Sequence, residues 1–425
     1  MHTVVIADDV TGANDIGIMY AKAGHKTLVY SYGTGEKKEY ADCDVLVIDT
    51  DSRFDTRKKA YEKVQHALKN TPKERVGQFI DKQCSVFRGN IGAEFDAMLD
   101  SLNEEFAAVV LGFPNNGRTT LHSVHYVYGT LLENSQFKND PVHPMTCSNL
   151  CSILGEQTKR RVSSIHFETY DKGMEFTKLA LERERQLGGY CIMDVRNNKD
   201  LEFLAELLKE ERIVCGSSAL SEHLAKIKEK TSESAKQEMR DEENNRIFCV
   251  AGSLTPQTVQ QTQYLRDHGY PVYEMDTRKL LDEQLYKKEC IRMYKKIEDA
   301  YQQNCVVMVH SMNTPELVQE TKELAKETGI NNTAVSALVS GALSEIAVYA
   351  AERLGIRKFI ICGGDTSASF CAGLGIEGMQ VQEEIETGLP TCRSVDEPYY
   401  QLVLKSGSFG SPEFLEKAVE RLNGR

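Results

Sequence analysis

The chain has 425 residues, a length that predicts two domains rather than one. Its hydrophobic share of 41% and charged share of 27% are typical of a soluble globular protein. The formal net charge of −12 argues against a surface that binds nucleic acid or an acidic membrane. An anionic small molecule stays compatible with this charge, because a few local Arg and Lys side chains decide its binding.

The cysteines and the apolar segments indicate a cytoplasmic protein with reduced thiols. The twelve cysteines are spread along the chain without a CxxC motif, and the Cys147/Cys151 pair lacks the second pair that a zinc site needs. Met1 and His2 lead directly into a predicted strand, so we expect no signal peptide. No apolar run approaches the roughly 20 residues that span a membrane, so we expect no membrane segment.

The stretch VVIADDVTGANDIG, residues 4–17, organises the first half of the chain. Residues 4–6 are β-branched and apolar, which predicts a buried strand, and residues 14–24 have the apolar spacing of a helix. Asp8 and Asp9 therefore lie at the carboxyl end of a strand, where open α/β sheets bind their ligands. Two carboxylates there suit metal coordination or base catalysis. The alternative is that one of them caps the helix and the other is solvated.

Strands and helices alternate through the rest of the first half. The predicted strands are residues 26–30, 44–49, 107–112, 190–194 and 212–215, and the predicted helices are residues 57–68, 91–102 and 149–157. A further helix is expected to start at residues 216–218. This alternation predicts a parallel sheet with crossover helices.

A second polar group follows residue 78. Lys82, Ser85, Arg88 and Asn90 lie between an apolar run and the helix predicted from residue 91. The free N–H groups at that helix start, together with the fork of Arg88, suit one carboxylate or phosphate. The alternative is a solvated turn in which Arg88 forms a structural salt bridge.

His122 and His125 follow the strand predicted over residues 107–112. A spacing of three residues suits a metal on one face of a helix, but no carboxylate partner is evident in the sequence. We therefore favour a substrate-binding or structural role for both.

Residues 226–244 are highly charged and poor in apolar side chains, which is typical of a linker. The second half then repeats the strand, polar turn and helix order, with predicted strands over residues 247–250, 306–310, 358–362 and 402–404 and a long helix over 335–354. The expected fold class is α/β, with two Rossmann-like three-layer domains, mostly parallel sheets and an interdomain cleft.

Glycine-rich turns follow three of the later strands. They contain Gly252-Ser253, residues 363–367 and residues 405–410. Such turns let the backbone approach a phosphate closely, and a following helix start favours an anion. The GxxxxGK[ST] pattern of a Walker nucleotide site is absent from the sequence. Residues 373–378 match GxGxxG, but they follow a helix predicted over residues 368–373 and precede a strand, so we interpret them as a glycine helix stop.

Taken in this order, these segments resemble the four-carbon acid sugar kinase family across nearly the whole chain. The segments that carry the resemblance are residues 7–13 (ADDVTGA), 52–53 (SR), 88–94 (RGNIGAE), 113–114 (FP), 117–119 (GRT), 252–253 (GS), 363–367 (GGDTS), 405–407 (KSG) and 409–410 (FG). The resemblance implies a kinase that uses ATP with Mg²⁺ and phosphorylates the terminal hydroxyl of a four-carbon sugar acid, such as threonate, erythronate or 3-oxo-tetronate. It also implies that residues 1–225 bind the sugar acid and residues 245–425 bind the nucleotide.

The resemblance also implies roles for individual side chains. Asp8 and Asp9 are the candidate catalytic residues, which orient or deprotonate the acceptor hydroxyl or help to hold Mg²⁺. The candidate sugar-acid residues are Asp9, Arg53, Lys82, Cys84, Ser85, Arg88 and Asn90, with the three cations as candidates for the substrate carboxylate. The candidate nucleotide residues are Gly252, Ser253, Gly363, Gly364, Asp365, Thr366, Lys405, Ser406 and Gly407. In-line phosphoryl transfer needs mainly positioning and charge neutralisation from such groups.

The chain departs from the family pattern at one place. The usual Lys-x-Asp-Ser-Thr-Leu before Arg-Gly-Asn is Lys82-Gln83-Cys84-Ser85-Val86-Phe87 here. A thiol replaces a carboxyl group at Cys84, and a methyl group replaces a hydroxyl at Val86. We expect this exchange to change which acid the site recognises, including a non-tetronate acid.

Two other functions remain open from the sequence. One is a sugar-acid isomerase or aldolase that uses the N-terminal acids and His122 or His125 with a metal. The other is a sugar-acid sensor without catalysis. The expected partners are small molecules, with no nucleic acid, no membrane and a possible homodimer.

Overall fold

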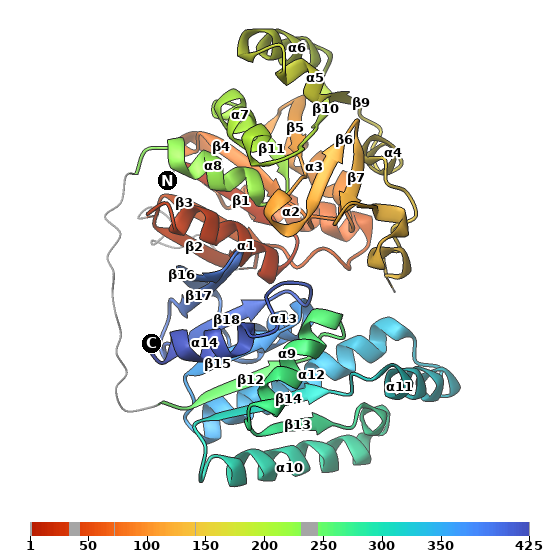
Figure 1. Ribbon diagram of the computed structural model, residues 1–425, viewed down its shortest axis with the longest axis vertical. Helices are drawn as coiled ribbons and strands as arrows, with labels where there is room; N and C mark the ends of the chain where they lie inside the picture. Colours follow the sequence, from red (N-terminus) through yellow and green to blue (C-terminus); the bar gives the residue numbers. More distant parts are fainter. Residues whose placement is uncertain (1, 34–42, 72, 141, 231–244, 425) are drawn as a thin grey trace. The chain divides into compact units, whose positions relative to one another are not determined.

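A computed structural model describes residues 2–33, 43–71, 73–140, 142–230 and 245–424. The chain divides into two compact units, Met1–Ser234 and Ala235–Arg425. Each unit is an α/β structure with helices packed on a sheet (Figure 1). The predicted α/β fold class is confirmed, and the two units are described separately below.

The sheet of the N-terminal unit has the order β2-β3-β1-β4-β11-β5-β10-β9, and its neighbouring strands pair in parallel. The strands are β1 Thr3–Ala7, β2 Thr27–Ser31, β3 Val45–Asp49, β4 Gln78–Lys82, β5 Phe106–Val110, β9 Val162–Ile165, β10 Gly189–Met193 and β11 Ile213–Gly216. A small separate antiparallel sheet contains β6 Arg118–Leu121, β7 Val124–Val127 and β8 Thr130–Leu131.

The helices of this unit cover both faces of its sheet. They are α1 Val10–Ala21, α2 Arg57–Lys69, α3 Ile91–Leu102, α4 Leu150–Gly155, α5 Phe167–Tyr170, α6 Met174–Leu187, α7 Asn198–Leu208 and α8 Ala219–Ile227. Helix α1 packs on α8, and α2 packs on α3. The chain leaves β1 toward β3 and β2 on one side, and later continues from β4 on the other side. The order of strands therefore reverses between β1 and β4, which is where such folds form a ligand crevice.

The sheet of the C-terminal unit has the order β13-β14-β12-β15-β18-β17-β16. Its strands are β12 Ile247–Ala251, β13 Val272–Met275, β14 Val306–Ser311, β15 Lys358–Cys362, β16 Gly378–Glu386, β17 Leu389–Ser394 and β18 Gln401–Lys405. Pairing is parallel from β13 to β18, and β17 and β16 add an antiparallel ribbon. The helices are α9 Pro256–Asp267, α10 Glu283–Ala300, α11 Pro315–Glu327, α12 Asn332–Arg353, α13 Gly364–Gly373 and α14 Phe414–Leu422.

Apolar side chains fix helices on the two faces of this second sheet. Leu265 of α9 and Phe414 of α14 are buried in one cluster with alternate residues of the central strands. On the other face, the ring of Phe370 in α13 packs 4.9 Å from that of Phe359 in β15. The turns after β12 and β15 therefore lead to opposite faces, and the strand order again reverses between these two neighbours.

Two helices begin earlier than the sequence pattern predicts. Helix α1 begins at Val10 instead of Asn14, because the Asp9 side chain caps it by accepting the Gly12 N–H at 2.7 Å. Helix α13 begins at Gly364 instead of Ala368. The predicted glycine stop is confirmed, since α13 ends at Gly373 and Gly375 has a φ of +66°.

The predicted linker overlaps the end of α8, which continues through Ile227. Residues 231–244 of that linker lie outside the described residues.

Among the described residues, helix α12 is long and apolar enough to cross a membrane by length and composition alone. This helix has 22 residues and a mean hydropathy of 1.5 over an 18-residue window, of which half is buried in the unit. It packs against α10 and α13. A buried core helix of an α/β unit has this composition too, so length and hydropathy alone are weak evidence for a membrane span.

Candidate functional site

The Arg53 guanidinium joins the two aspartates that follow β1. Its Nε and Nη2 donate to the two oxygens of Asp8 at 2.6 and 2.7 Å, and its Nη1 donates to Asp9 Oδ2 at 2.5 Å. All three side chains are buried. They come together because β1 lies beside β3, with Ala7 opposite Asp49, so the turns after both strands share one edge. The predicted grouping of Asp8, Asp9 and Arg53 is therefore present in the structure.

The two aspartates have different surroundings. Asp8 is fully buried, whereas Asp9 is 9% exposed. Asp9 also accepts hydrogen bonds from Gly12 N and from the Thr11 hydroxyl. Although burial raises the pKa of Asp9, the charges of Arg53 and Lys82 outweigh this and lower it. Asp9 is thus an ionised helix cap, as the alternative interpretation of the sequence had it, and it is also the more accessible carboxylate. The other half of that alternative, a solvated second aspartate, is wrong because Asp8 is fully buried.

Lys82 approaches Asp9 from the end of β4. A Cβ atom at Gly12 would lie 2.6 Å from Asp9 Oδ1 and 3.1 Å from Lys82 Nζ, so the absence of a side chain at Gly12 permits this close arrangement. Lys82 Nζ lies 3.4 Å from Asp15 Oδ2 and donates to the Gln83 carbonyl at 3.2 Å. Sequence reasoning did not identify Asp15, although it lies in the same segment as Asp8 and Asp9.

Arg88 and Cys84 form the more open part of the site. Arg88 Nε donates to Cys84 Sγ at 3.4 Å, and Arg88 Nη1 donates to Asp140 Oδ2. The Arg88 side chain is 21% exposed. Burial raises the pKa of the Cys84 thiol, but the charges of Arg88 and Arg53 outweigh this and lower it below its ordinary value. The ion pair with Asp140 matches the alternative predicted for Arg88, and sequence reasoning had no signal for it because the two residues are 52 positions apart.

Asn90 holds the loop that carries Arg53. Its Nδ2 donates to the carbonyls of Ser52 at 3.0 Å and Asp55 at 2.9 Å, so its contacts position this loop. The Ser85 carbonyl accepts from His125 Nε2 at 3.0 Å, and the other ring nitrogen of His125 bonds the Thr120 hydroxyl. His125 is fully buried with both nitrogens occupied, which fits a structural role.

A buried pair of carboxyl groups lies behind the aspartates. Gln83 Nε2 donates to Asp81 Oδ1 at 2.6 Å and to Glu94 Oε2 at 2.8 Å, and neither acid is exposed. Burial and the nearby charge of Asp8 raise the pKa of Asp81 to about 8, and burial with Asp81 raises that of Glu94 well above its ordinary value. At least one proton is therefore held in this pair at neutral pH. Sequence reasoning did not identify it, although both acids flank the predicted site segments.

In the C-terminal unit, three glycine turns lie side by side. Strands β12, β15 and β18 are parallel neighbours, with Ala251 opposite Cys362 and Cys362 opposite Lys405. The turns that follow them therefore meet at one edge, and contain Gly252, Ser253, Gly363, Gly364, Thr366, Ser406 and Gly407. The N–H of Gly363 donates to the Lys405 carbonyl at 2.9 Å, which links two of the turns.

Glycine is required in these turns by close packing. A Cβ at Gly407 would lie 2.0 Å from Ser253 Oγ, and one at Gly252 would lie 2.2 Å from Thr366 Oγ1. Gly363 has a φ of +122°, which side-chain-bearing residues rarely adopt. The turns thus expose backbone where side chains would otherwise stand, which is what phosphate binding by amides needs.

Lys405 and Asp365 differ strongly in exposure. Lys405 is fully buried, and its Nζ donates to Thr258 Oγ1 at 3.1 Å and to the carbonyls of Ser406 and Gly407 at 3.0 and 3.3 Å. Its contacts therefore brace the turn, and burial lowers its pKa. Asp365 is exposed in the first turn of α13, where it accepts from Ser336 Oγ at 3.2 Å.

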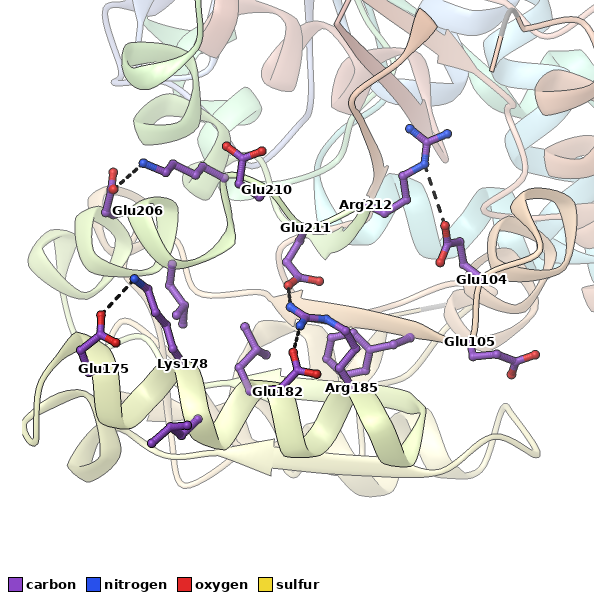
Figure 2. A pocket seen from close by; sticks show the side chains of 15 residues that line it. Glu104, Glu105, Glu175, Lys178, Glu182, Arg185, Glu206, Glu210, Glu211 and Arg212 are labelled. Carbon is purple, nitrogen blue, oxygen red and sulfur yellow. Dashed lines mark hydrogen bonds and ion pairs between the residues drawn. The ribbon is translucent and has the colours of Figure 1, made fainter. Parts of the chain in front are cut away.

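A separate hollow of about 800 Å³ lies between α6, α7 and the start of β5 (Figure 2). Phe106 begins β5 and Arg212 directly precedes β11, so this hollow lies at the amino ends of the strands, opposite the edge that carries Asp8. Its charged side chains pair with each other: Arg185 bonds Glu182 and Glu211, and Lys209 bonds Glu206 (Figure 2). We assign no function to it.

Fold and sites together define a two-unit α/β protein with an Arg-linked carboxylate pair in one unit and a glycine-turn platform in the other. Residues 3–224 match a family described as a sugar-binding N-terminal domain, and residues 248–415 match one described as a nucleotide-binding C-terminal domain. The chain belongs to the four-carbon acid sugar kinase family.

Similar proteins cover almost the full chain. A 3-oxo-tetronate kinase from Salmonella typhimurium is 30% identical, with 97% of each chain covered, and one from Pseudomonas savastanoi is 29% identical, with 99% of this chain and 97% of that protein covered. Among solved structures, a Salmonella typhimurium protein has a TM-score of 0.78 at 28% identity and a Haemophilus influenzae protein has 0.71 at 26%, each covering 98% of both chains. These likenesses support a phosphotransferase.

Proposed function

We propose that the protein is an ATP-dependent cytoplasmic kinase that phosphorylates the terminal hydroxyl of a four-carbon sugar acid of the threonate, erythronate or 3-oxo-tetronate type. The observation that carries this proposal is the pairing of two different strand-end sites in one chain. One offers ionised carboxylates and cations, and the other offers exposed backbone at three adjacent glycine turns. An acceptor with a carboxylate and hydroxyls suits the first site, and a nucleoside triphosphate suits the second.

Arg88 is the proposed anchor for the substrate carboxylate. Among the described residues its hydrogen bonds use Nε and Nη1, which leaves Nη2 to donate to a ligand. Its side chain is also the most exposed of the three candidate cations. Arg53 uses three of its five N–H groups on Asp8 and Asp9, so two remain to donate to a ligand. Lys82 supplies a further positive charge beside them.

Asp9 is the proposed partner of the acceptor hydroxyl, because it is ionised and more accessible than Asp8. A carboxylate with a lowered pKa is a weak base, and it serves mainly by accepting the hydroxyl hydrogen bond and aligning the attacking oxygen. A loose phosphoryl-transfer transition state needs little more from the base. Asp8 acts as a positioning residue by holding Arg53.

The glycine turns are the proposed site for the ATP phosphates, which their backbone amides would hold. Mg²⁺ enters with ATP as part of that substrate. The exposed carboxylate of Asp365 fits the oxygen-donor preference of this ion and stands in the first turn of α13 beside those turns.

The test is ADP release with Mg-ATP against a panel of four- to six-carbon sugar acids, with neutral sugars as controls. We expect one acid to be turned over strongly and the sugars not at all. Conversion of an acid without ADP release would instead support an isomerase or aldolase. Tight binding of an acid with neither reaction would support a sensor.

A further inference from the structure

Two histidines and one aspartate meet at the starts of the first three strands, at the edge of the N-terminal sheet opposite the one that carries Asp8. His2 directly precedes β1, His25 lies two residues before β2, and Asp44 directly precedes β3. One ligand atom from each lies within 4.8 Å of the others. Backbone pairing fixes this arrangement, because the His2 N–H donates to the Asp44 carbonyl at 3.0 Å and the Lys26 N–H to Asp44 Oδ2 at 2.9 Å.

Each imidazole has one occupied nitrogen and one buried nitrogen without a hydrogen-bond partner. His25 Nε2 bonds the Ala225 carbonyl at 2.8 Å, and His2 Nδ1 bonds the Thr3 hydroxyl at 3.1 Å. The nitrogens left over are His25 Nδ1 and His2 Nε2. Because a carbonyl only accepts, His25 Nε2 carries the proton, and in the neutral ring Nδ1 is a lone pair. His25 is only 2% exposed, so this lone pair cannot be satisfied by bulk water.

We propose that His2, His25 and Asp44 bind a divalent transition-metal ion, with Zn²⁺ as the ion of choice. Two neutral imidazoles and one carboxylate are a common three-ligand set for zinc, with water in the fourth position. The bonds from His25 to Ala225 and from His2 to Thr3 are the outer contacts that metal-bound histidines usually make.

The ligand atoms must move closer together, by at most about 1.5 Å, to surround one zinc ion. His25 Nδ1 lies 3.9 Å from Asp44 Oδ2, and ligand atoms around tetrahedral zinc are roughly 3.3 Å apart. Among the charged groups near the cluster, Lys228 acts on His2 through its positive charge. The positive charge of Lys228 would repel a bound metal ion and weaken its binding. Removing this charge therefore provides a second test of the site.

A second cluster of the same kind, His122, His166 and Asp194, provides the matched control. His122 and His166 have side chains 56% and 38% exposed, and Asp194 already accepts the backbone N–H groups of residues 122 and 123. The imidazoles of this cluster are therefore more exposed than that of His25, although His166 Nδ1 is also a buried nitrogen without a hydrogen-bond partner.

The experiment measures Zn²⁺ binding by competition with a chromophoric chelator, and thermal unfolding, on the full chain without a histidine tag. We expect the wild-type chain to bind one zinc ion and to show a higher Tm when zinc is bound. His2→Gln should abolish this rise in Tm and weaken the affinity for Zn²⁺ at least about tenfold. His122→Gln should keep the zinc affinity and the rise in Tm of the wild-type chain. Lys228→Gln should bind zinc more tightly than the wild-type chain. Asp44→Asn repeats the test if His2→Gln does not fold. Absence of stoichiometric binding, equal affinity in His2→Gln, or loss in His122→Gln instead would overturn the proposal.

Discussion

Arg53 donates to both oxygens of Asp8, from Nε at 2.6 Å and from Nη2 at 2.7 Å, and both residues are buried. This bidentate pair engages both oxygens of Asp8, which is fully buried, and leaves Asp9 as the more accessible carboxylate. The two neighbouring aspartates are therefore expected to differ in what their replacement changes.

Asp9→Asn should reduce sugar-acid-dependent ADP release at least about 100-fold, because the charge that aligns the acceptor hydroxyl is lost. Its effect on Tm should be smaller than that of Asp8→Ala, since Asn still caps the helix although the charge that pairs with Arg53 is lost. Asp8→Ala should instead lower the free energy of unfolding by about 3–5 kcal/mol, because it leaves the Arg53 charge buried without its main partner. Steady-state kinetics and urea unfolding measure the two effects, and an active Asp9→Asn enzyme would contradict the assignment.

Arg88→Ala should raise the KM for the sugar acid about 10- to 100-fold, because a charge-assisted hydrogen bond to the substrate carboxylate is lost. The KM for ATP should change little. Arg160→Ala is the control, since Arg160 pairs with Asp100 and Glu105 near the amino ends of the strands. An unchanged KM in Arg88→Ala would remove Arg88 from the site.

Gly407→Ala should weaken ATP binding strongly, because the added Cβ would lie 2.0 Å from Ser253 Oγ and displace the turn. Gly341→Ala in α12 is the matched control, as nothing lies within 4 Å of its added Cβ and helix propensity favours Ala by about 0.5–1 kcal/mol. Isothermal titration with a non-hydrolysable ATP analogue measures both. Equal affinities in the two variants would argue against a nucleotide at these turns.

Stability should fall as the pH rises from about 4 to 8. The folded state raises the pKa of Asp81 to about 8, so in this interval it holds a proton that the unfolded chain, with a pKa near 3.9, has released. Asp81→Asn keeps the Gln83 hydrogen bond without a titrating group, and should flatten this slope. Urea unfolding at pH 5, 6.5 and 8 measures how the free energy of unfolding changes with pH in the wild-type chain and in Asp81→Asn. An equal slope in both proteins would show that Asp81 does not hold the proton.

Cys84 should react with iodoacetamide at pH 7 faster than Cys147 and Cys151, which are similarly half-buried, because Arg88 and Arg53 lower the pKa of its thiol. A bound sugar acid should protect it. Peptide mass spectrometry measures the rates site by site, and Cys84→Ser identifies the labelled peptide. If Cys84 is labelled slowly, or at the same rate with and without the sugar acid, Cys84 does not line the sugar-acid site.

The sequence predicted the parts of this structure that depend on local pattern. Apolar runs located the central strands, so the ends that carry Asp8 and Gly252 could be identified before the fold was known. The start of α1 was missed because the capping bond from Gly12 to Asp9 overrides the apolar spacing on which the prediction relied. The small β6–β8 sheet was missed because His122 and His125 were considered only on a helix.

Long-range pairing could not be predicted from pattern. The sequence identified Arg53 and Arg88 as cations, but it gave no sign that Asp8 would hold the first and Asp140 the second. Likewise, Lys405 was expected beside phosphate, whereas its ammonium group is enclosed by Thr258 and the carbonyls of its own turn. Such partners depend on which strands become neighbours, and that follows from the whole topology.

The most direct test of the account follows the γ-phosphoryl group itself. The wild-type chain and Asp9→Asn would be incubated with Mg-ATP labelled in the γ-phosphate and the best acid of the panel, and the product analysed by ³¹P NMR. We expect a phosphate monoester on the terminal hydroxyl with wild type and almost none with Asp9→Asn. Label released only as inorganic phosphate, or equal transfer by both proteins, would contradict this expectation.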